Sequence, residues 1–186
     1  MRNQPLLNIW IISDTHFFHD KLMEYCGRPA DHTNKIFQNL MKIPEKDLLI
    51  HLGDISIGRA AEVHEKFIMP LKCRKILVKG NHDRKTNNWY MMHGWDFVCY
   101  TFQDDYRGRK ILFSHYPVNA KDYDYNLHGH LHNNVYKWDK LTDENKKFVN
   151  KKHLLFAVEN TGYRPLKLDY ILDKPDKFRL INTFKE

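Results

Sequence analysis

Short apolar runs alternate with more polar segments along the first half of the chain. Three continuous apolar runs are typical of strands buried on both faces: Asn8–Ile12, Asp47–Leu52 and Lys75–Val78. Segments expected to be helical lie between or after them, at Asn34–Lys42, Ala60–Met69 and Arg84–His93. Strands that alternate with helices indicate an α/β protein.

The second half of the chain is richer in predicted strands. The expected strands are Asp96–Phe102, Lys110–Phe113, Asn126–His128, His153–Val158 and Phe178–Thr183. This distribution predicts two sheets packed together with helices outside them. The polar, lysine-rich stretch Asn133–Lys152 is interpreted as an excursion or loop hairpin. No repeat, low-complexity tract or linker divides the chain, so residues 1–186 are predicted to form a single domain.

Composition narrows the class of protein. A chain of 186 residues with 42% apolar and 13% aromatic residues has enough apolar side chains for a packed core. No apolar run reaches the length of a membrane span, and Met1–Pro5 lacks the apolar region of a signal peptide. Cys26, Cys73 and Cys99 form no CxxC pair and indicate free thiols in a reducing compartment. We therefore expect a cytoplasmic protein without a membrane partner, and the sequence leaves its oligomeric state open.

The chain is basic, with a formal net charge of +7 and an isoelectric point of about 9.2. Such an excess would help to attract an anionic substrate or nucleic acid, although a solvated basic surface explains it equally well. The cluster Lys146, Lys147, Lys151 and Lys152 is interpreted as a solvated face in preference to a nucleic-acid contact.

Five short polar stretches follow apolar runs and share a restricted set of side chains. They are Asp14-Thr15-His16, Gly53-Asp54, Gly80-Asn81-His82-Asp83, Ser114-His115 and Gly129-His130-Leu131-His132. Oxygen and imidazole ligands without cysteine suit Mn, Fe, Zn or similar divalent metals. Seven such side chains exceed the need of one tetrahedral ion and predict two ions with a shared carboxylate. A two-metal site usually hydrolyses phosphate esters.

The positions of these stretches favour convergence. In α/β sheets, ligands bind beyond the carboxyl ends of the strands, where separate strands deliver their side chains to one edge. The i, i+2 spacing of Asp14 and His16, and of His130 and His132, would place each pair on one side of an extended backbone. Glycines at 53, 80 and 129 permit tight turns where side chains would crowd the ions. Each stretch alone is more often a turn or a cap, but all five in this order are hard to explain separately.

The ordered set of stretches resembles the calcineurin-like metallophosphoesterases, and the likeness extends from Ile9 to His132. The segment Tyr163–Asp169 also resembles the closing segment of small bacterial and phage members. The resemblance implies an α/β/β/α sandwich of two packed sheets with flanking helices, with a dinuclear metal site at the carboxyl ends of the strands. Protein Ser/Thr phosphatases are disfavoured, because Gly53-Asp54 is not followed by the Asp-Arg-Gly of that branch.

The resemblance also implies a role for each residue. The first ion would be held by Asp14, His16 and His132, and the second by Asn81, His115 and His130. Asp54 would bridge the two ions, His82 would donate a proton, and Asp83 would hold the loop or the imidazole. His19 and Arg59 are candidate substrate contacts, although a surface position is the favoured reading of each.

The implied function is metal-dependent hydrolysis of a phosphodiester or phosphomonoester, with a nucleotide-like substrate favoured, by attack of a metal-bridging hydroxide. Two divalent ions are expected from among Mn, Fe, Zn, Ni and Mg, with Mn favoured. The first alternative is a nuclease on DNA or RNA, which would need a basic groove beside the ions. The second is a non-catalytic interaction module, which is disfavoured because all seven ligands and His82 are present.

Overall fold

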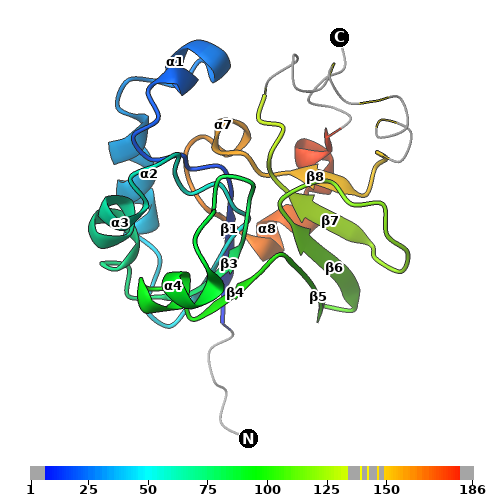
Figure 1. The fold of residues 1–186 in the computed structure, drawn as a ribbon. Coiled ribbons are helices and arrows are strands. Elements are labelled where there is room, and N and C mark those ends of the chain that lie inside the picture. Colours follow the sequence, from blue (N-terminus) through cyan, green and yellow to red (C-terminus); the bar gives the residue numbers. More distant parts are fainter. Residues whose placement is uncertain (1–6, 134–138, 140–141, 143–145, 147–148, 181–186) are drawn as a thin grey trace, which may run out of the picture.

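The computed structural model describes residues 7–133, 139, 142, 146 and 149–180, which form two sheets with flanking helices (Figure 1). The first sheet has the strand order β4-β3-β2-β1-β9. Its strands are β1 (Ile9–Ile12), β2 (Leu48–His51), β3 (Arg74–Val78), β4 (Phe97–Cys99) and β9 (Leu166–Lys167). The strands β1 to β4 are parallel, and β9 pairs antiparallel with β1. The carboxyl ends of β1, β2 and β3 therefore lie at one edge.

The second sheet has the order β5-β6-β7-β8. Its strands are β5 (Thr101–Tyr106), β6 (Arg109–Ser114), β7 (Tyr125–His128) and β8 (His153–Leu155). A two-residue turn at Arg107 and Gly108, both with positive φ, joins β5 to β6 as an antiparallel hairpin. Because β6, β7 and β8 are parallel, their carboxyl ends also share one edge.

Helices cover the outer face of the first sheet (Figure 1). They are α1 (Lys21–Cys26), α2 (His32–Leu40), α3 (Ala60–Val63) with its π-helical continuation His64–Ile68, and α4 (Asn87–Met92). The C-terminal part contains α7 (Val158–Thr161), α8 (Leu168–Asp173) and the 3₁₀-helix Pro175–Phe178. No helix within the described ranges combines the length and the apolar character needed to cross a membrane.

Two clusters of buried side chains hold these layers together. Along β1, Ile12 packs with the helices of the outer layer, while its neighbour Ile11 packs towards the second sheet. The inter-sheet cluster also contains Phe113 of β6, Leu127 of β7 and Ile171 of α8. Strands buried on both faces need the continuous apolar runs that the sequence contains. The predicted α/β class with two packed sheets is therefore confirmed.

Some predicted elements differ from the structure. The single strand expected at Asp96–Phe102 is wrong, because β4 joins the first sheet and β5 joins the second, with the exposed Tyr100 between them. The expected strand His153–Val158 is shorter, since Val158 already begins α7.

The expected final strand at Phe178–Thr183 is also not found in the described part of this segment, which ends at Leu180. Phe178 ends a 3₁₀-helix that begins at Pro175, whose ring suits the first position of a helix. Arg179 forms only an isolated bridge with Leu154, and residues 181–183 lie outside the described residues. Most of the segment Asn133–Lys152 is likewise outside them.

Candidate metal centre

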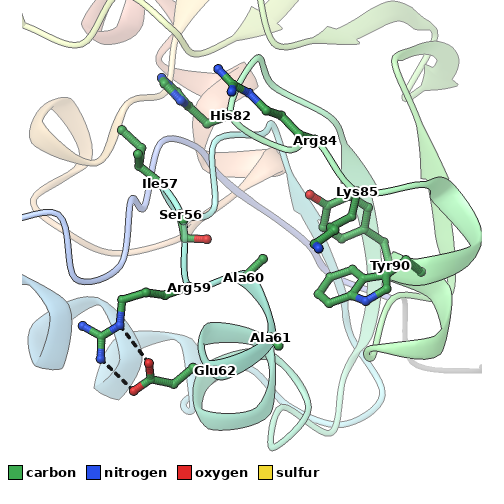
Figure 2. Close-up of a pocket in the computed structure, with 12 residues that line it drawn as sticks. Ser56, Ile57, Arg59, Ala60, Ala61, Glu62, His82, Arg84, Lys85 and Tyr90 are labelled. Atoms are coloured by element: carbon green, nitrogen blue, oxygen red, sulfur yellow. Dashed lines mark hydrogen bonds and ion pairs between the residues drawn. The ribbon is translucent and has the colours of Figure 1, made fainter.

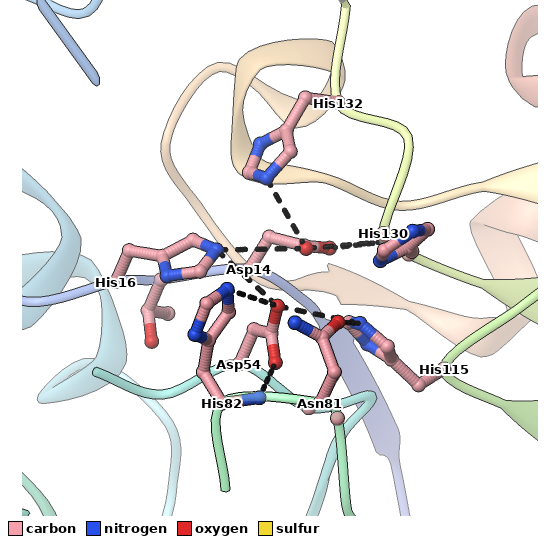
Figure 3. A network of polar contacts seen from close by, with 12 residues as sticks. Asp14, His16, Asp54, Asn81, His82, His115, His130 and His132 are labelled. Carbon is pink, nitrogen blue, oxygen red and sulfur yellow. Dashed lines mark hydrogen bonds and ion pairs between the residues drawn. The ribbon is translucent and has the colours of Figure 1, made fainter. Parts of the chain in front are cut away.

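The loops that follow five strands converge at one place between the two sheets (Figure 3). Loops after β1, β2 and β3 bring residues of the first sheet, and loops after β6 and β7 bring residues of the second. The structure thus gathers all seven side chains expected to be ligands, together with the expected proton donor: Asp14, His16, Asp54, Asn81, His82, His115, His130 and His132.

Asp54 lies at the centre of this group. Its Oδ2 atom is 3.5 Å from Nε2 of His16 and 3.3 Å from Nε2 of His115. Its Oδ1 atom accepts a hydrogen bond of 2.9 Å from the backbone N–H of His82. Burial alone would raise the pKa of Asp54, but the hydrogen bond and charge of His115 outweigh burial and lower it. The same pair raises the pKa of His115 to about 9, although burial acts to lower it. One carboxylate therefore faces imidazoles from both sheets.

Two sets of side chains, one of which includes Asp54, have the arrangement of metal ligands. In each set, one ligand atom per residue lies within 4.8 Å of the others. The first set comprises Asp14, His16 and His132, and the second comprises Asp54, His115 and His130. Asn81 extends the second set, because its Oδ1 atom is 3.2 Å from Nε2 of His115.

The ring of His16 is buried in a way that fits a metal ion. The residue is 2% exposed, and neither ring nitrogen has a hydrogen-bond partner within the described part of the chain. Burial, followed by the charge of His132, holds the pKa of His16 well below its ordinary value. The neutral imidazole is the form that binds metals, and an unsatisfied buried nitrogen is costly without a partner. The residues present therefore fit a divalent ion.

The backbone at the site is strained. Asp14 (φ 56°), His16 (φ 44°), Asp54 (φ 58°), His130 (φ 71°) and His132 (φ 53°) all adopt the left-handed region. Residues other than glycine enter this region at a cost of about 1–3 kcal/mol each, and they persist only where the surroundings enforce it. The expectation that the Asp14–His16 and His130–His132 pairs lie on extended backbone is therefore wrong, because β1 ends at Ile12 and β7 at His128. Left-handed turns, not strand alternation, aim these side chains.

Two glycines leave room for the carboxylates. A Cβ atom at position 129 would overlap the side chains of Ser13 and Asp14, and one at position 80 would overlap the carboxylate of Asp54. The expectation that Gly80 and Gly129 prevent crowding at the site is confirmed.

Asp83 is buried behind Asp54 and holds its loop. Its Oδ2 atom accepts hydrogen bonds from the backbone N–H groups of Asp54 at 2.7 Å and Gly80 at 2.9 Å. Its Oδ1 atom accepts a third from Ile55 at 3.2 Å. Burial is the main reason that the pKa of Asp83 is raised to about 6. Of the two roles expected for Asp83, its contacts match the holding of the loop.

Two further residues that contact the site were not singled out from the sequence. Arg28 donates hydrogen bonds of 2.7 Å to the backbone carbonyls of Asp14 and Thr15. The same guanidinium pairs with Glu159, whose carboxylate also contacts His132. Only its position just after an apolar run could have drawn attention to Glu159. Together these residues fix the loop after β1 against α7.

The two candidate substrate contacts lie at the edge of the site. The ring of His19 is 5.9 Å from that of His16, and burial followed by the charge of Arg28 lowers its pKa. Arg59 lines a neighbouring pocket, but its guanidinium pairs with Glu62 at 2.8 Å and lies over the ring of Phe18. Arg59 is therefore already engaged within the protein.

This fold, with its cluster of aspartate and histidine side chains at the strand ends, defines a metal-dependent phosphoesterase. Residues 7–173 match the calcineurin-like phosphoesterase family, and the chain belongs to that family.

Two similar proteins extend along nearly the whole chain. The uncharacterized protein MJ1445 of Methanocaldococcus jannaschii is 25% identical, covering 96% of this chain and 97% of its own. The crystal structure of the protein of unknown function AQ665 from Aquifex aeolicus has a TM-score of 0.71 and 25% identity, covering 91% of this chain and 100% of its own. Neither name states an activity, so neither protein indicates the substrate.

Proposed function

We propose that the chain hydrolyses a phosphodiester or phosphomonoester of the nucleotide class with two divalent ions, Mn²⁺ being favoured. The observation that carries this proposal is the position of Asp54 between two sets of metal-binding side chains. Asp14, His16 and His132 would hold one ion, and Asn81, His115 and His130 the other, with Asp54 shared. When bound, the ions supply Lewis acidity, which activates water and offsets charge on the phosphate.

His82 is assigned as the proton donor. Its Nε2 atom lies 4.0 Å from Oδ2 of Asp54, and 29% of its side chain is exposed, whereas the His16 and His115 side chains are buried. A histidine at the rim of the site can reach the leaving oxygen without binding an ion. Its backbone N–H is fixed by the carboxylate of Asp54, so the ring is held beside the phosphate. Transfer of its proton to the leaving oxygen is general acid catalysis.

A nuclease remains the second candidate. Arg84 and Lys85 lie two and three residues after His82 and line the same pocket, as phosphate contacts of a nucleic acid would require. Cys26, Cys73 and Cys99 are free thiols, which supports the proposal of a cytoplasmic location.

The test is an activity screen combined with a metal count. The metal-free protein is loaded with Mn²⁺ and assayed with bis-p-nitrophenyl phosphate, p-nitrophenyl phosphate, cyclic nucleotides, DNA and RNA. We expect the loaded protein to hydrolyse at least one of these esters. Elemental mass spectrometry should find two bound metal ions per chain. Asp54→Asn should lose both activity and ions, whereas Asp104→Asn, on the exposed part of β5, should lose neither. A single ion per chain, or no hydrolysis of any ester, would contradict the proposal.

A further inference from the structure

A pocket of about 710 Å³ opens beside His82 (Figure 2). One wall is the segment from Ser56 to Glu62, and the other is the segment from His82 to Tyr90. The pocket is large enough for a nucleotide unit, since small-molecule sites have volumes of about 300–1,000 Å³. Among the described residues, His82 is the only one of the eight side chains gathered at the candidate metal centre that lines the pocket. The pocket therefore lies on the side of the site where the leaving group receives its proton.

The two walls differ in charge. On the first wall, Arg59 pairs with Glu62, and Lys66 pairs with the same carboxylate at 2.9 Å. On the second wall, Arg84 and Lys85 are exposed. Glu62 is the sole carboxylate among the described residues that line the pocket. The second wall therefore presents a positive charge that the pocket does not neutralise, and it suits an anionic group.

A buried lysine holds the second wall in place. Lys79 is 7% exposed, and its Nζ atom donates a hydrogen bond of 2.7 Å to the backbone carbonyl of Lys85. The same ammonium lies 5.5 Å from the ring centroid of Tyr90. At the start of α4, the side chain of Thr86 accepts a hydrogen bond of 3.1 Å from the backbone N–H of Trp89. The segment that carries Arg84 and Lys85 is thus ordered before any ligand arrives.

An aromatic side chain completes this wall. Trp89 is half-buried and lines the pocket, and its ring stacks on that of His93 with centroids 3.8 Å apart. The Nζ atom of Lys85 lies over the ring of Trp89, 5.6 Å from its centroid. An indole ring paired with a cation suits a nucleotide, because bases stack on aromatic rings while cations contact the phosphate backbone.

We infer that this pocket binds the leaving group, and that this group is a nucleotide unit with a phosphate of its own. The inference rests on the proposed function and specifies its substrate as a phosphodiester between two nucleotide units. In the reaction, water gives up a proton to the solvent and forms a new bond to phosphorus, the bond from phosphorus to the leaving oxygen breaks, and His82 gives that oxygen a proton, which it regains from the solvent. Arg84 and Lys85 then contact the second phosphate, and Trp89 contacts the base.

The test compares two dinucleotides that differ only in their outer phosphates. Thymidylyl-thymidine (TpT) has none, whereas pTpTp has one at each end, so its leaving unit is phosphorylated whichever bond breaks. With the Mn²⁺-loaded protein, we expect kcat/KM to be about tenfold higher for pTpTp, the size of one charge-assisted contact. In R84Q/K85Q the ratio of the two kcat/KM values should fall to about one. Because the ratio is taken within one variant, a general loss of activity cancels.

A matched control removes the same charge elsewhere. Lys72 and Arg74 lie at the opposite end of β3 from the site, and both are exposed. K72Q/R74Q should keep the wild-type ratio, and thermal unfolding verifies that both double variants are folded. If wild type cleaves TpT and pTpTp equally well, or if the two double variants lose the preference equally, the pocket does not bind a phosphorylated leaving group. That result leaves the proposed function intact, because the proposed function fails if no phosphoester is hydrolysed or if each chain binds a single ion.

Discussion

The carboxylate of Glu159 accepts a hydrogen bond of 3.0 Å from Nδ1 of His132, 27 residues away in the chain. A carboxylate only accepts, so Nδ1 carries a proton and Nε2 is the nitrogen that faces Asp14, whose Oδ1 atom is 3.5 Å away. Burial would raise the pKa of Glu159, but the hydrogen bond from His132 and the charge of Arg28 lower it to about 2. A carboxylate in this position orients a metal-binding histidine and increases its basicity.

Glu159→Gln should weaken the binding of metal at the set that contains His132. We expect a loss of about 10–100-fold in Mn²⁺ affinity, as is typical when a hydrogen-bond partner of a metal-binding histidine is changed. Calorimetric titration of the metal-free protein measures this affinity. Glu24→Gln, on the exposed side of α1, is the control and should bind Mn²⁺ as the wild type does. Equal affinities for both variants would show that Glu159 has no such role.

Gly129→Ala should disturb the carboxylate of Asp14. The added Cβ has no room beside Ser13 and Asp14, so the site must shift or the loop must open. We expect both Mn²⁺ affinity and ester hydrolysis to fall at least about tenfold. Gly27→Ala is the comparison, because Gly27 has a positive φ but open space around it. Its effect should be confined to thermal stability. Normal metal binding by Gly129→Ala would contradict the crowding argument.

His82→Ala should retain both ions but lose acid catalysis. The loss should depend on the leaving group, since p-nitrophenolate leaves without a proton while a nucleoside alkoxide does not. We expect hydrolysis of TpT to slow by about 10²–10⁴-fold and that of bis-p-nitrophenyl phosphate to change far less. Steady-state kinetics on the two substrates, with the metal content of each sample, provide the measurement. Equal loss on both substrates would assign His82 a different role.

His64 should make the fold sensitive to acid. It is 1% exposed, its Nδ1 atom contacts the carbonyl of Ala60 at 2.7 Å, and its Nε2 atom is buried without a hydrogen-bond partner. Burial is the main cause that lowers its pKa from 6.5 to about 4. A folded-state pKa below the unfolded value means that stability is present above 6.5 and falls as the pH decreases towards 4.

The measurement is the free energy of unfolding in urea at about pH 7.5 and about pH 5, for wild type and His64→Gln. Between these two pH values, the free energy of unfolding should fall by about 2 kcal/mol more for the wild type than for the variant. Proton linkage predicts a difference of this size from the pKa values of 6.5 and about 4. The difference between the two proteins isolates His64 from other titrating groups. Equal decreases in the free energy of unfolding of the two proteins would show that protonation of His64 does not destabilise the folded state.

The sequence predicted the site more fully than it predicted the elements that support it. Each polar stretch follows an apolar run, and carboxyl ends of parallel strands meet at one edge, so convergence followed from local pattern alone. The left-handed backbone at Asp14 and His16 could not be predicted in this way. These conformations are energetically unfavourable, and they persist only because contacts in the folded site enforce them.

Contacts between distant segments account for what the sequence did not reveal. Arg28 and Glu159 are separated by 131 residues and acquire a role only when α7 packs against the loop after β1. The division of Asp96–Phe102 into two strands had no local signal either. The Cα partners of Cys99 and Thr101 lie in different sheets, and the backbone bends at Tyr100 between them.

The distribution of the site over both sheets has a consequence for how metals are acquired. Asp14, His16, Asp54 and Asn81 are synthesised before residue 82, whereas His115, His130 and His132 follow the crossing at Tyr100. A chain that ends at Tyr100 therefore carries four of the seven proposed ligands, and neither three-residue set is complete in it. If these residues hold the ions as proposed, the metal would be selected only after the two sheets have docked, when the geometry of the finished site can discriminate among ions.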